Sequence, residues 1–165
     1  MKNINFFVYG SLREGFYNYN KFLAGKIFKK KQGKLHNVKL YHMPYKGYPA
    51  IVPGEDYVLG EIMVINKEDY DSTMKALDKM EGFISEGNSE NEYHKMLLEV
   101  ENIENNQNEL CYVYFYNKDR DKLFDTEAIY IPNGDWKDYM LNNSIILIEP
   151  FIYNKEILLR ISPYL

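Results

Sequence analysis

Cysteine is nearly absent from this 165-residue sequence, in which Cys111 is the only one. A single cysteine cannot form a disulfide within the chain, so a disulfide-stapled scaffold is excluded. Free thiols persist in reducing compartments, which favours a cytoplasmic protein. Cys111 lies inside an apolar, strand-like segment, where we expect a small core side chain rather than a nucleophile.

Long hydrophobic runs are also missing. The apolar stretch near the N-terminus, within MKNINFFVYGS, is too short for the hydrophobic region of a signal peptide. The later run from Ile145 to Ile148 falls far short of the roughly 20 residues that a membrane-spanning helix needs. We therefore expect a soluble, cytoplasmic protein with no membrane partner.

A surplus of basic residues is missing too, since 24 Asp and Glu face 20 Lys and Arg for a net charge of −4. Nucleic-acid binders normally carry a basic surplus or stripe, so we expect no nucleic-acid partner. The histidines, His36, His42 and His94, form no H-x-x-x-H spacing and no cysteine cluster accompanies them. We therefore expect no metal site.

The chain does have ample material for a core: 45% of its residues are hydrophobic, and 16 of them are tyrosines. Its length suits one domain, because domains cluster at about 100–150 residues. We expect a single domain over residues 1–165, with residues 141–165 as a C-terminal extension. The apolar composition of residues 145–165 predicts an ordered tail. The sequence does not decide between a monomer and a homodimer.

Runs of β-branched and aromatic residues predict many strands. The main ones are expected at residues 4–9, 26–31, 34–42, 57–65, 93–101 and 109–117. Gly60 inside one of them indicates a bulge or a close backbone approach. The strands do not alternate with helices, which disfavours a doubly wound parallel sheet. The expected fold class is α+β, a small, mostly antiparallel β-barrel with one or two packed helices.

Residues 67–81 form the best helix candidate, with Asn66 as N-cap and Gly82 at a left-handed C-terminal cap. Tyr70, Met74, Leu77 and Glu81 would share one face of this helix. A carboxylate on a buried face loses hydration, and desolvation raises its pKa. Such a glutamate can both accept and donate a proton. Alternatively, the helix ends before Glu81 and leaves that side chain exposed.

The segment Tyr9-Gly10-Ser11-Leu12-Arg13 ends the first predicted strand in a Gly-Ser turn. Such turns can direct consecutive backbone N–H groups into one concavity that binds an anion. Arg13 would add positive charge there. A plain strand-to-loop turn is the alternative interpretation. A serine hydrolase is disfavoured, because Ser11 does not lie in a G-x-S-x-G elbow.

Seven short motifs resemble, in their order, those of the γ-glutamylcyclotransferase-like (AIG2-like) family. They are Tyr9-Gly10-Ser11-Leu12, Gly47-Tyr48-Pro49-Ala50, the strand 57–64, Leu77-Asp78-Lys79-Met80-Glu81-Gly82, Tyr93-His94-Lys95, the aromatic strand 112–116, and Gly134-Asp135-Trp136 with Tyr139. Each is short, but together they cover about residues 4–140. Lys95 stands where the family usually has Arg, which keeps the charge and loses the bidentate fork.

The resemblance implies a barrel-like α+β fold with one deep pocket, a γ-glutamyl small-molecule substrate and no metal or organic cofactor. In the family's reaction the α-amine of a γ-glutamyl group attacks its own γ-carbonyl, which yields 5-oxoproline and a free amine or amino acid. Glu81 would transfer the proton. The N–H groups of Gly10, Ser11 and Leu12 would hold a substrate carboxylate beside Tyr9, and Tyr93 and Tyr114 would line the pocket.

One rival interpretation is a non-catalytic binding module of the same fold that recognises a carboxylate-bearing small molecule. An inward carboxylate at Glu81 argues against it, because burying that charge is costly and a pure binder gains nothing from it. The released amine is left open among γ-glutamyl amino acids, ε-(γ-glutamyl)-lysine and γ-glutamyl protecting groups. Asp78, off the apolar face, is expected to be solvated.

Overall fold

A computed structural model describes residues 3–148 of the chain. Its strands are β1 (Asn5–Val8), β2 (Ile27–Met43), β3 (Tyr48–Ile65), β4 (Tyr93–Asn102), β5 (Gln107–Tyr116) and β6 (Ile129–Tyr130). Its helices are α1 (Tyr17–Phe22), α2 (Tyr70–Met80), α3 (Phe124–Glu127) and α4 (Trp136–Ile148), with short 3-10 turns at Lys67–Asp69 and Lys118–Arg120.

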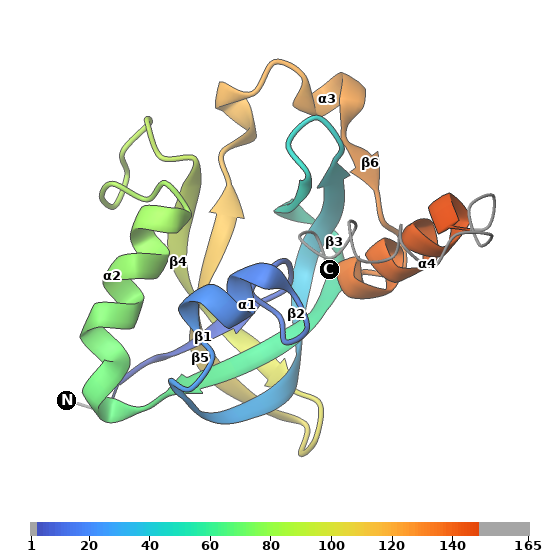
Figure 1. Cartoon of the computed structure of the whole chain (residues 1–165). Coiled ribbons are helices and arrows are strands. Elements are labelled where there is room, and N and C mark those ends of the chain that lie inside the picture. Colours follow the sequence, from blue (N-terminus) through green and yellow to red (C-terminus); the bar gives the residue numbers. More distant parts are fainter. Residues whose placement is uncertain (1–2, 149–165) are drawn as a thin grey trace.

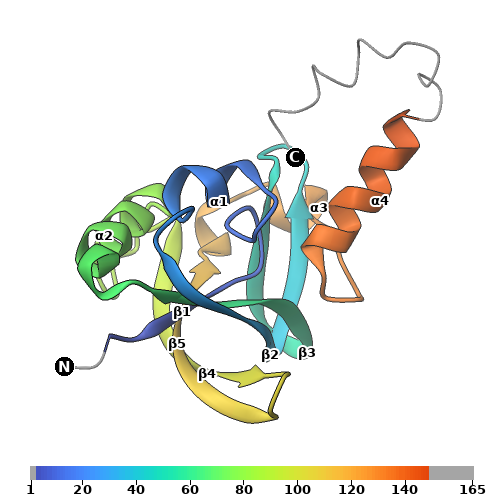
Figure 2. The same cartoon turned by 60° about the horizontal axis from the view of Figure 1, so that its bottom comes forward.

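The strands form a closed barrel. They follow the order β3-β1-β5-β4-β2, and the pairing of β2 with β3 closes the ring while β6 adds to β2. Only the pairing between β1 and β5 is parallel among the described strands. The predicted α+β class with a mostly antiparallel barrel is confirmed, and α2 and α4 lie on opposite sides of that barrel (Figure 1 and Figure 2).

The hairpin of β2 and β3 is longer than the sequence indicated. Residues 26–31 and 34–42 were expected as two strands, but they form one strand that runs through Gly33. A side chain at Gly33 would lie 2.9 Å from Phe7, so the glycine marks close packing inside the barrel rather than a turn. The register shifts between His36 and Val38, where Asn37 has a φ of 61°, which is a β-bulge that bends the strand.

Gly60 lies where β3 crosses close to β1. A Cβ atom on Gly60 would stand 2.2 Å from the backbone oxygen of Val8 and 2.7 Å from the ring of Phe7. The close backbone approach predicted for Gly60 is therefore confirmed. It lets β1 sit against β3 immediately before the chain turns at Gly10.

Helix α2 packs one apolar face on the barrel, as its periodicity predicts. Met74 and Leu77 are buried in the same cluster as Phe6 and Met63, with Tyr70 at its edge. The start of the helix differs from the expectation. A 3-10 turn at Lys67–Asp69 precedes the helix. Asn66, which was expected as the N-cap, stands before that turn, and its side chain makes no capping hydrogen bond.

The chain after β6 forms α4, which begins at Trp136 and continues to Ile148. Trp136 is buried against Phe16, with ring centroids 5.0 Å apart, and its Nε1–H donates to His42 Nδ1. The ordered tail predicted for residues 145–165 lies almost wholly outside the described residues. No helix within residues 3–148 combines the length and hydropathy needed to cross a membrane.

Cys111 occupies the barrel core as predicted. Its side chain is fully buried, and burial raises the pKa of the thiol to about 12. The thiol therefore stays protonated near neutral pH and acts as a small apolar residue.

We expect Gly60→Ala to destabilise the protein by about 1–3 kcal/mol, because an added methyl group must displace β1 from β3. Urea unfolding of both proteins measures the difference. Gly54→Ala is the comparison, since the three atoms nearest its Cβ belong to the Lys39 side chain rather than to backbone, and a change of the Lys39 rotamer moves the nearest of them, Cγ, away. Equal stability losses in the two variants would contradict this account of Gly60.

Candidate active site

The end of α2 places Glu81 at the wall of a cavity. The helix ends at Met80, Glu81 is the C-cap residue, and Gly82 has a φ of 62°. Gly82 N–H donates to Lys79 O and Phe83 N–H donates to Asp78 O, which together form a Schellman motif. The helix thus ends before Glu81, as the alternative interpretation supposed. Its side chain is nevertheless half-buried rather than exposed.

The Glu81 carboxyl group has an unusual electrostatic environment. Burial away from water, together with the nearby negative charge of Glu92, raises its pKa to about 8. Within residues 3–148 no group donates a hydrogen bond to it that would stabilise the ionised form. Glu81 can therefore exchange a proton close to neutral pH.

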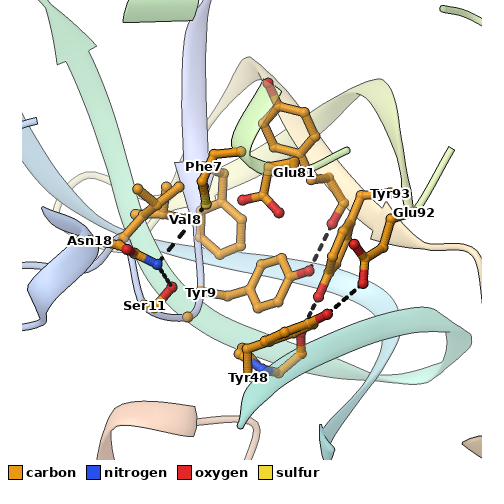
Figure 3. Close-up of a pocket in the computed structure, with 14 residues that line it drawn as sticks. Phe7, Val8, Tyr9, Ser11, Asn18, Tyr48, Glu81, Glu92 and Tyr93 are labelled. Atoms are coloured by element: carbon orange, nitrogen blue, oxygen red, sulfur yellow. Dashed lines mark hydrogen bonds between the residues drawn. The ribbon is translucent and has the colours of Figure 1, made fainter. Parts of the chain in front are cut away.

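A cavity of about 210 Å³ opens beside this carboxyl group (Figure 3). All the residues predicted for the site line it: Tyr9, Gly10, Ser11, Leu12, Glu81, Tyr93 and Tyr114. The remaining wall comes from Phe7, Val8, Asn18, Tyr48, Pro49, Met80 and Glu92. The structure thus brings together residues that lie up to 105 positions apart in the sequence, while their roles stay predictions.

Buried tyrosines form the rigid part of this wall. Tyr9 Oη donates to the backbone oxygen of Tyr114 at 2.8 Å, and Tyr93 Oη donates to the backbone oxygen of Pro49 at 2.6 Å. Burial first, and the nearby charge of Glu81 as well, raises the pKa of both phenols, so they stay neutral. Their hydroxyl groups are committed to backbone carbonyls, which fixes the ring positions.

The turn after β1 leaves backbone donors available at the cavity. Gly10 permits the approach of this turn to Pro49, because a Cβ atom there would lie 2.4 Å from Pro49 Cγ. Among the described groups, none accepts a hydrogen bond from the N–H of Ser11 or Leu12. Ser11 Oγ instead accepts from Asn18 Nδ2 at 2.8 Å. Unpaired N–H groups beside a cavity suit an anionic ligand.

Arg13 does not add its charge to the cavity, contrary to the expectation. Its side chain is only 7% exposed, and its Nη1 lies 2.7 Å from Asp135 Oδ1. Its Nε lies 3.7 Å from Glu61 Oε1 on β3. This buried ion cluster lies behind the turn and ties the turn to β3 and to the start of α4.

Asp78 and Lys95 form a second structural ion pair, so the expectation of a solvated Asp78 was wrong. Lys95 Nζ donates to both carboxylate oxygens of Asp78 at 2.8 Å. Tyr114 Oη donates to Asp78 Oδ1 at 2.6 Å and therefore points away from the cavity. Lysine in place of the usual arginine here contacts protein groups and does not line the cavity.

Glu92, the second carboxylate of the cavity, was not among the residues predicted from the sequence. Lys46 Nζ donates to Glu92 Oε1 at 2.8 Å, and the hydroxyl of Tyr48 donates to the same oxygen. Burial alone would raise the pKa of Glu92, but these two hydrogen bonds, together with the positive charges of Lys46 and Arg120, outweigh it and lower the pKa. Nothing in the local sequence marks this residue beyond its place before Tyr93. Its partners lie more than 40 positions away.

Within residues 3–148 no three His, Cys, Asp or Glu side chains come close enough together to hold an ion.

Stability should depend on pH through Glu81. A carboxyl group whose pKa rises from 4.5 to about 8 on folding binds its proton more tightly in the folded state. Wild-type stability therefore falls as pH rises between these values. We expect Glu81→Gln, which cannot ionise, to be about 1–3 kcal/mol more stable than wild type at pH 8.5, with a smaller difference at pH 5.

Urea unfolding at pH 5, 7 and 8.5 measures this difference. Glu86→Gln is the control, because Glu86 is an exposed residue of the loop after α2. That variant should keep the pH dependence of the wild type. The account of Glu81 fails if its variant and the wild type show parallel pH dependence.

Sequence and structure comparisons find proteins that are similar to this chain. A sequence profile of the family described as "Gamma-glutamyl cyclotransferase, AIG2-like" matches residues 6–138. The chain is 28% identical over 143 residues to the γ-L-glutamyl-butirosin B γ-glutamyl cyclotransferase of Niallia circulans, covering 85% of this chain and 80% of that enzyme.

Solved structures share the fold. A mouse AIG2-like protein aligns with a TM-score of 0.53 and 21% identity, covering 70% of this chain and 78% of its own. The protein YkqA of Bacillus subtilis aligns with a TM-score of 0.59 and 25% identity, covering 87% of this chain and 43% of its own. The barrel with its surrounding helices is thus the γ-glutamylcyclotransferase-like fold.

Proposed function

The chain belongs to the AIG2-like γ-glutamyl cyclotransferase family, and on this premise we propose that it converts a γ-glutamyl amine or amino acid to 5-oxoproline and the free amine. The observation that carries the proposal is the Glu81 carboxyl group, which lies at the cavity with a pKa of about 8 and no hydrogen-bond donor among the described residues. Proton transfer is the chemistry that such a group serves best.

The proposed reaction balances without a further reactant. The α-amine nitrogen of the substrate bonds to its own γ-carbonyl carbon, and the ionised Glu81 takes a proton from that nitrogen. The bond between the γ-carbon and the leaving nitrogen then breaks, and the protonated Glu81 returns the proton to the leaving nitrogen. A carboxyl group with a pKa near the working pH suits both halves of this transfer.

The rest of the cavity serves to hold the substrate in the cyclising conformation. The N–H groups of Gly10, Ser11 and Leu12 bind the α-carboxylate, with Tyr9 beside it. Tyr93 and Tyr114 form the opposite wall. Because nucleophile and electrophile belong to one molecule, orientation accounts for much of the rate acceleration. The fixed tyrosine hydroxyls keep this wall from adapting to other shapes.

We expect Glu81→Gln to lower 5-oxoproline release by about 100-fold or more, which is typical for loss of a general acid/base. The measurement is 5-oxoproline release from a panel of γ-glutamyl amino acids and amines. Glu86→Gln should retain wild-type rates, because that carboxylate is exposed and does not line the cavity.

Two results would decide against the proposal in different ways. Undiminished release by folded Glu81→Gln removes Glu81 as the catalyst. Tight binding of γ-glutamyl compounds without release by the wild type favours the non-catalytic binding module instead.

The pH profile should report the same group. We expect kcat/KM to rise with pH up to about pH 8, because the attacking amine needs the ionised form of Glu81. Glu92→Gln should move this acidic limb to lower pH, since it removes the negative charge that raises the pKa of Glu81. An unchanged limb in Glu92→Gln would mean that the limb belongs to another group.

A further inference from the structure

The cavity offers an anion no positively charged side chain. Among the described residues that line it, none is a lysine, an arginine or a histidine, while Glu81 and Glu92 are acidic. Arg13, next to the turn after β1, is paired with Asp135 and Glu61 behind that turn. A substrate carboxylate in this cavity therefore depends on neutral hydrogen-bond donors, and their number and direction determine how well it binds.

Ser11 carries a donor that the proposed reaction does not use, its side-chain hydroxyl. Ser11 lines the cavity, and its Oγ accepts a hydrogen bond from Asn18 Nδ2 at 2.8 Å. A hydroxyl group has one proton to donate besides the lone pairs that accept. Because the Asn18 amide occupies a lone pair of Oγ, the proton of the hydroxyl points elsewhere. Within residues 3–148 no group accepts it, so it remains available to a ligand.

The contacts of Asn18 favour the orientation of its amide group that donates to Ser11. Asn18 Nδ2 lies 2.8 Å from Ser11 Oγ and 4.0 Å from Met80 Sδ. The amide nitrogen has two N–H groups, one for each of these atoms. The reverse orientation would place the amide oxygen against the thioether sulfur, which has no proton to donate. Asn18 therefore donates to Ser11 and does not accept from it.

Asn18 also connects two parts of the cavity wall. It lies in α1, whose start is tied to the turn a second time, because Tyr19 N–H donates to Ser11 O at 3.3 Å. Its other partner, Met80, ends α2 and directly precedes Glu81. Figure 3 shows Asn18 beside Ser11 at the wall of the cavity. The Asn18 side chain thus lies between the turn after β1 and the end of α2.

We propose that Asn18 is a positioning residue, which holds Ser11 so that the hydroxyl proton points into the cavity and bonds the substrate carboxylate. This inference rests on the proposed function, in which the N–H groups of the turn bind the same carboxylate. The hydroxyl adds one more neutral donor where no cation is present. Asn18 acts only through Ser11, so its effect depends both on the hydroxyl and on the carboxylate.

Two substrates that differ only in this carboxylate test the proposal. One is a γ-glutamyl amide, and the other is the 4-aminobutanoyl amide of the same amine, which lacks the α-carboxylate and would cyclise to 2-pyrrolidinone. Release of the amine gives kcat/KM for both. The ratio of the two values measures what the carboxylate contributes. Damage to the fold lowers both values together and leaves the ratio unchanged.

We expect Ser11→Ala to lower this ratio about fivefold or more, because it removes a hydrogen bond to a charged group. Asn18→Leu should lower it about threefold or more, since the hydroxyl is then free to rotate. In the Ser11→Ala background, Asn18→Leu should lower the ratio no further. Asn20→Leu is the matched control, because Asn20 is an exposed residue of the same helix, and it should keep the wild-type ratio.

Asn18→Asp tests the same point with almost no change in shape. A carboxylate can only accept, so it draws the hydroxyl proton of Ser11 away from the substrate. The ratio should then fall at least as far as in Ser11→Ala, whereas Asn20→Asp, which adds the same charge at an exposed position, should leave it unchanged. A wild-type ratio in either Asn18 variant would overturn the proposal. So would an effect of Asn18→Leu that is equally large without the hydroxyl.

Calorimetric titration of the two amides, in the Glu81→Gln background to prevent turnover, separates this inference from the proposed function. Release of 5-oxoproline by wild type with one ratio in all variants leaves the function standing and removes the role of Asn18. Absence of release, with tighter binding of the γ-glutamyl amide that Asn18→Leu weakens, removes the function and supports the role. Absence of release with equal binding of both amides removes both.

Discussion

Two backbone hydrogen bonds at the end of α2 determine the geometry on which the site depends. Tyr93 N–H donates to Glu81 O at 3.2 Å, and Glu92 N–H donates to Gly82 O at 3.1 Å. The loop between Gly82 and Glu92 therefore begins and ends side by side. The fully buried side chain of Asn91 holds this loop, because it accepts from Ile84 N–H and donates to Ser85 O. Two carboxylates that are 11 positions apart in the sequence therefore face the same cavity.

The motifs that resemble the family are connected to one another by polar contacts. Pro49 O accepts from Tyr93 Oη, and Asp78 is bonded by both Lys95 and Tyr114. Arg13 links the first motif to Asp135 in the last. Short motifs that are individually weak thus belong to one hydrogen-bonded frame. Most of these contacts lie behind the cavity wall, where they hold the wall in position.

Local features of the fold could be predicted from the sequence, and distant partnerships could not. Gly82 as a left-handed cap and Gly60 as a close approach follow from the residues themselves, and both are present. Gly33 was expected to separate two strands, yet it lies within β2, where it packs closely on Phe7. No local sequence pattern reveals this contact with Phe7. Arg13 was misplaced because its partner Asp135 lies 122 positions away. For the same reason, the periodicity around Glu81 left two alternatives that only the tertiary packing resolves.

Glu81 and Glu92 share a cavity, yet their environments drive their pKa values in opposite directions. Lys46 and Tyr48 hold Glu92 in its ionised form, whereas burial holds Glu81 close to a pKa of 8. Two unpaired carboxylates would compete for one proton, and neither would have a defined role. The hydrogen bonds to Glu92 remove that competition and leave its negative charge to act on Glu81. Among residues 3–148 no group donates a hydrogen bond to the Glu81 carboxyl group, and this matters to the site as much as the donors to Glu92 do, because a lysine beside Glu81 would lower its pKa and fix its charge.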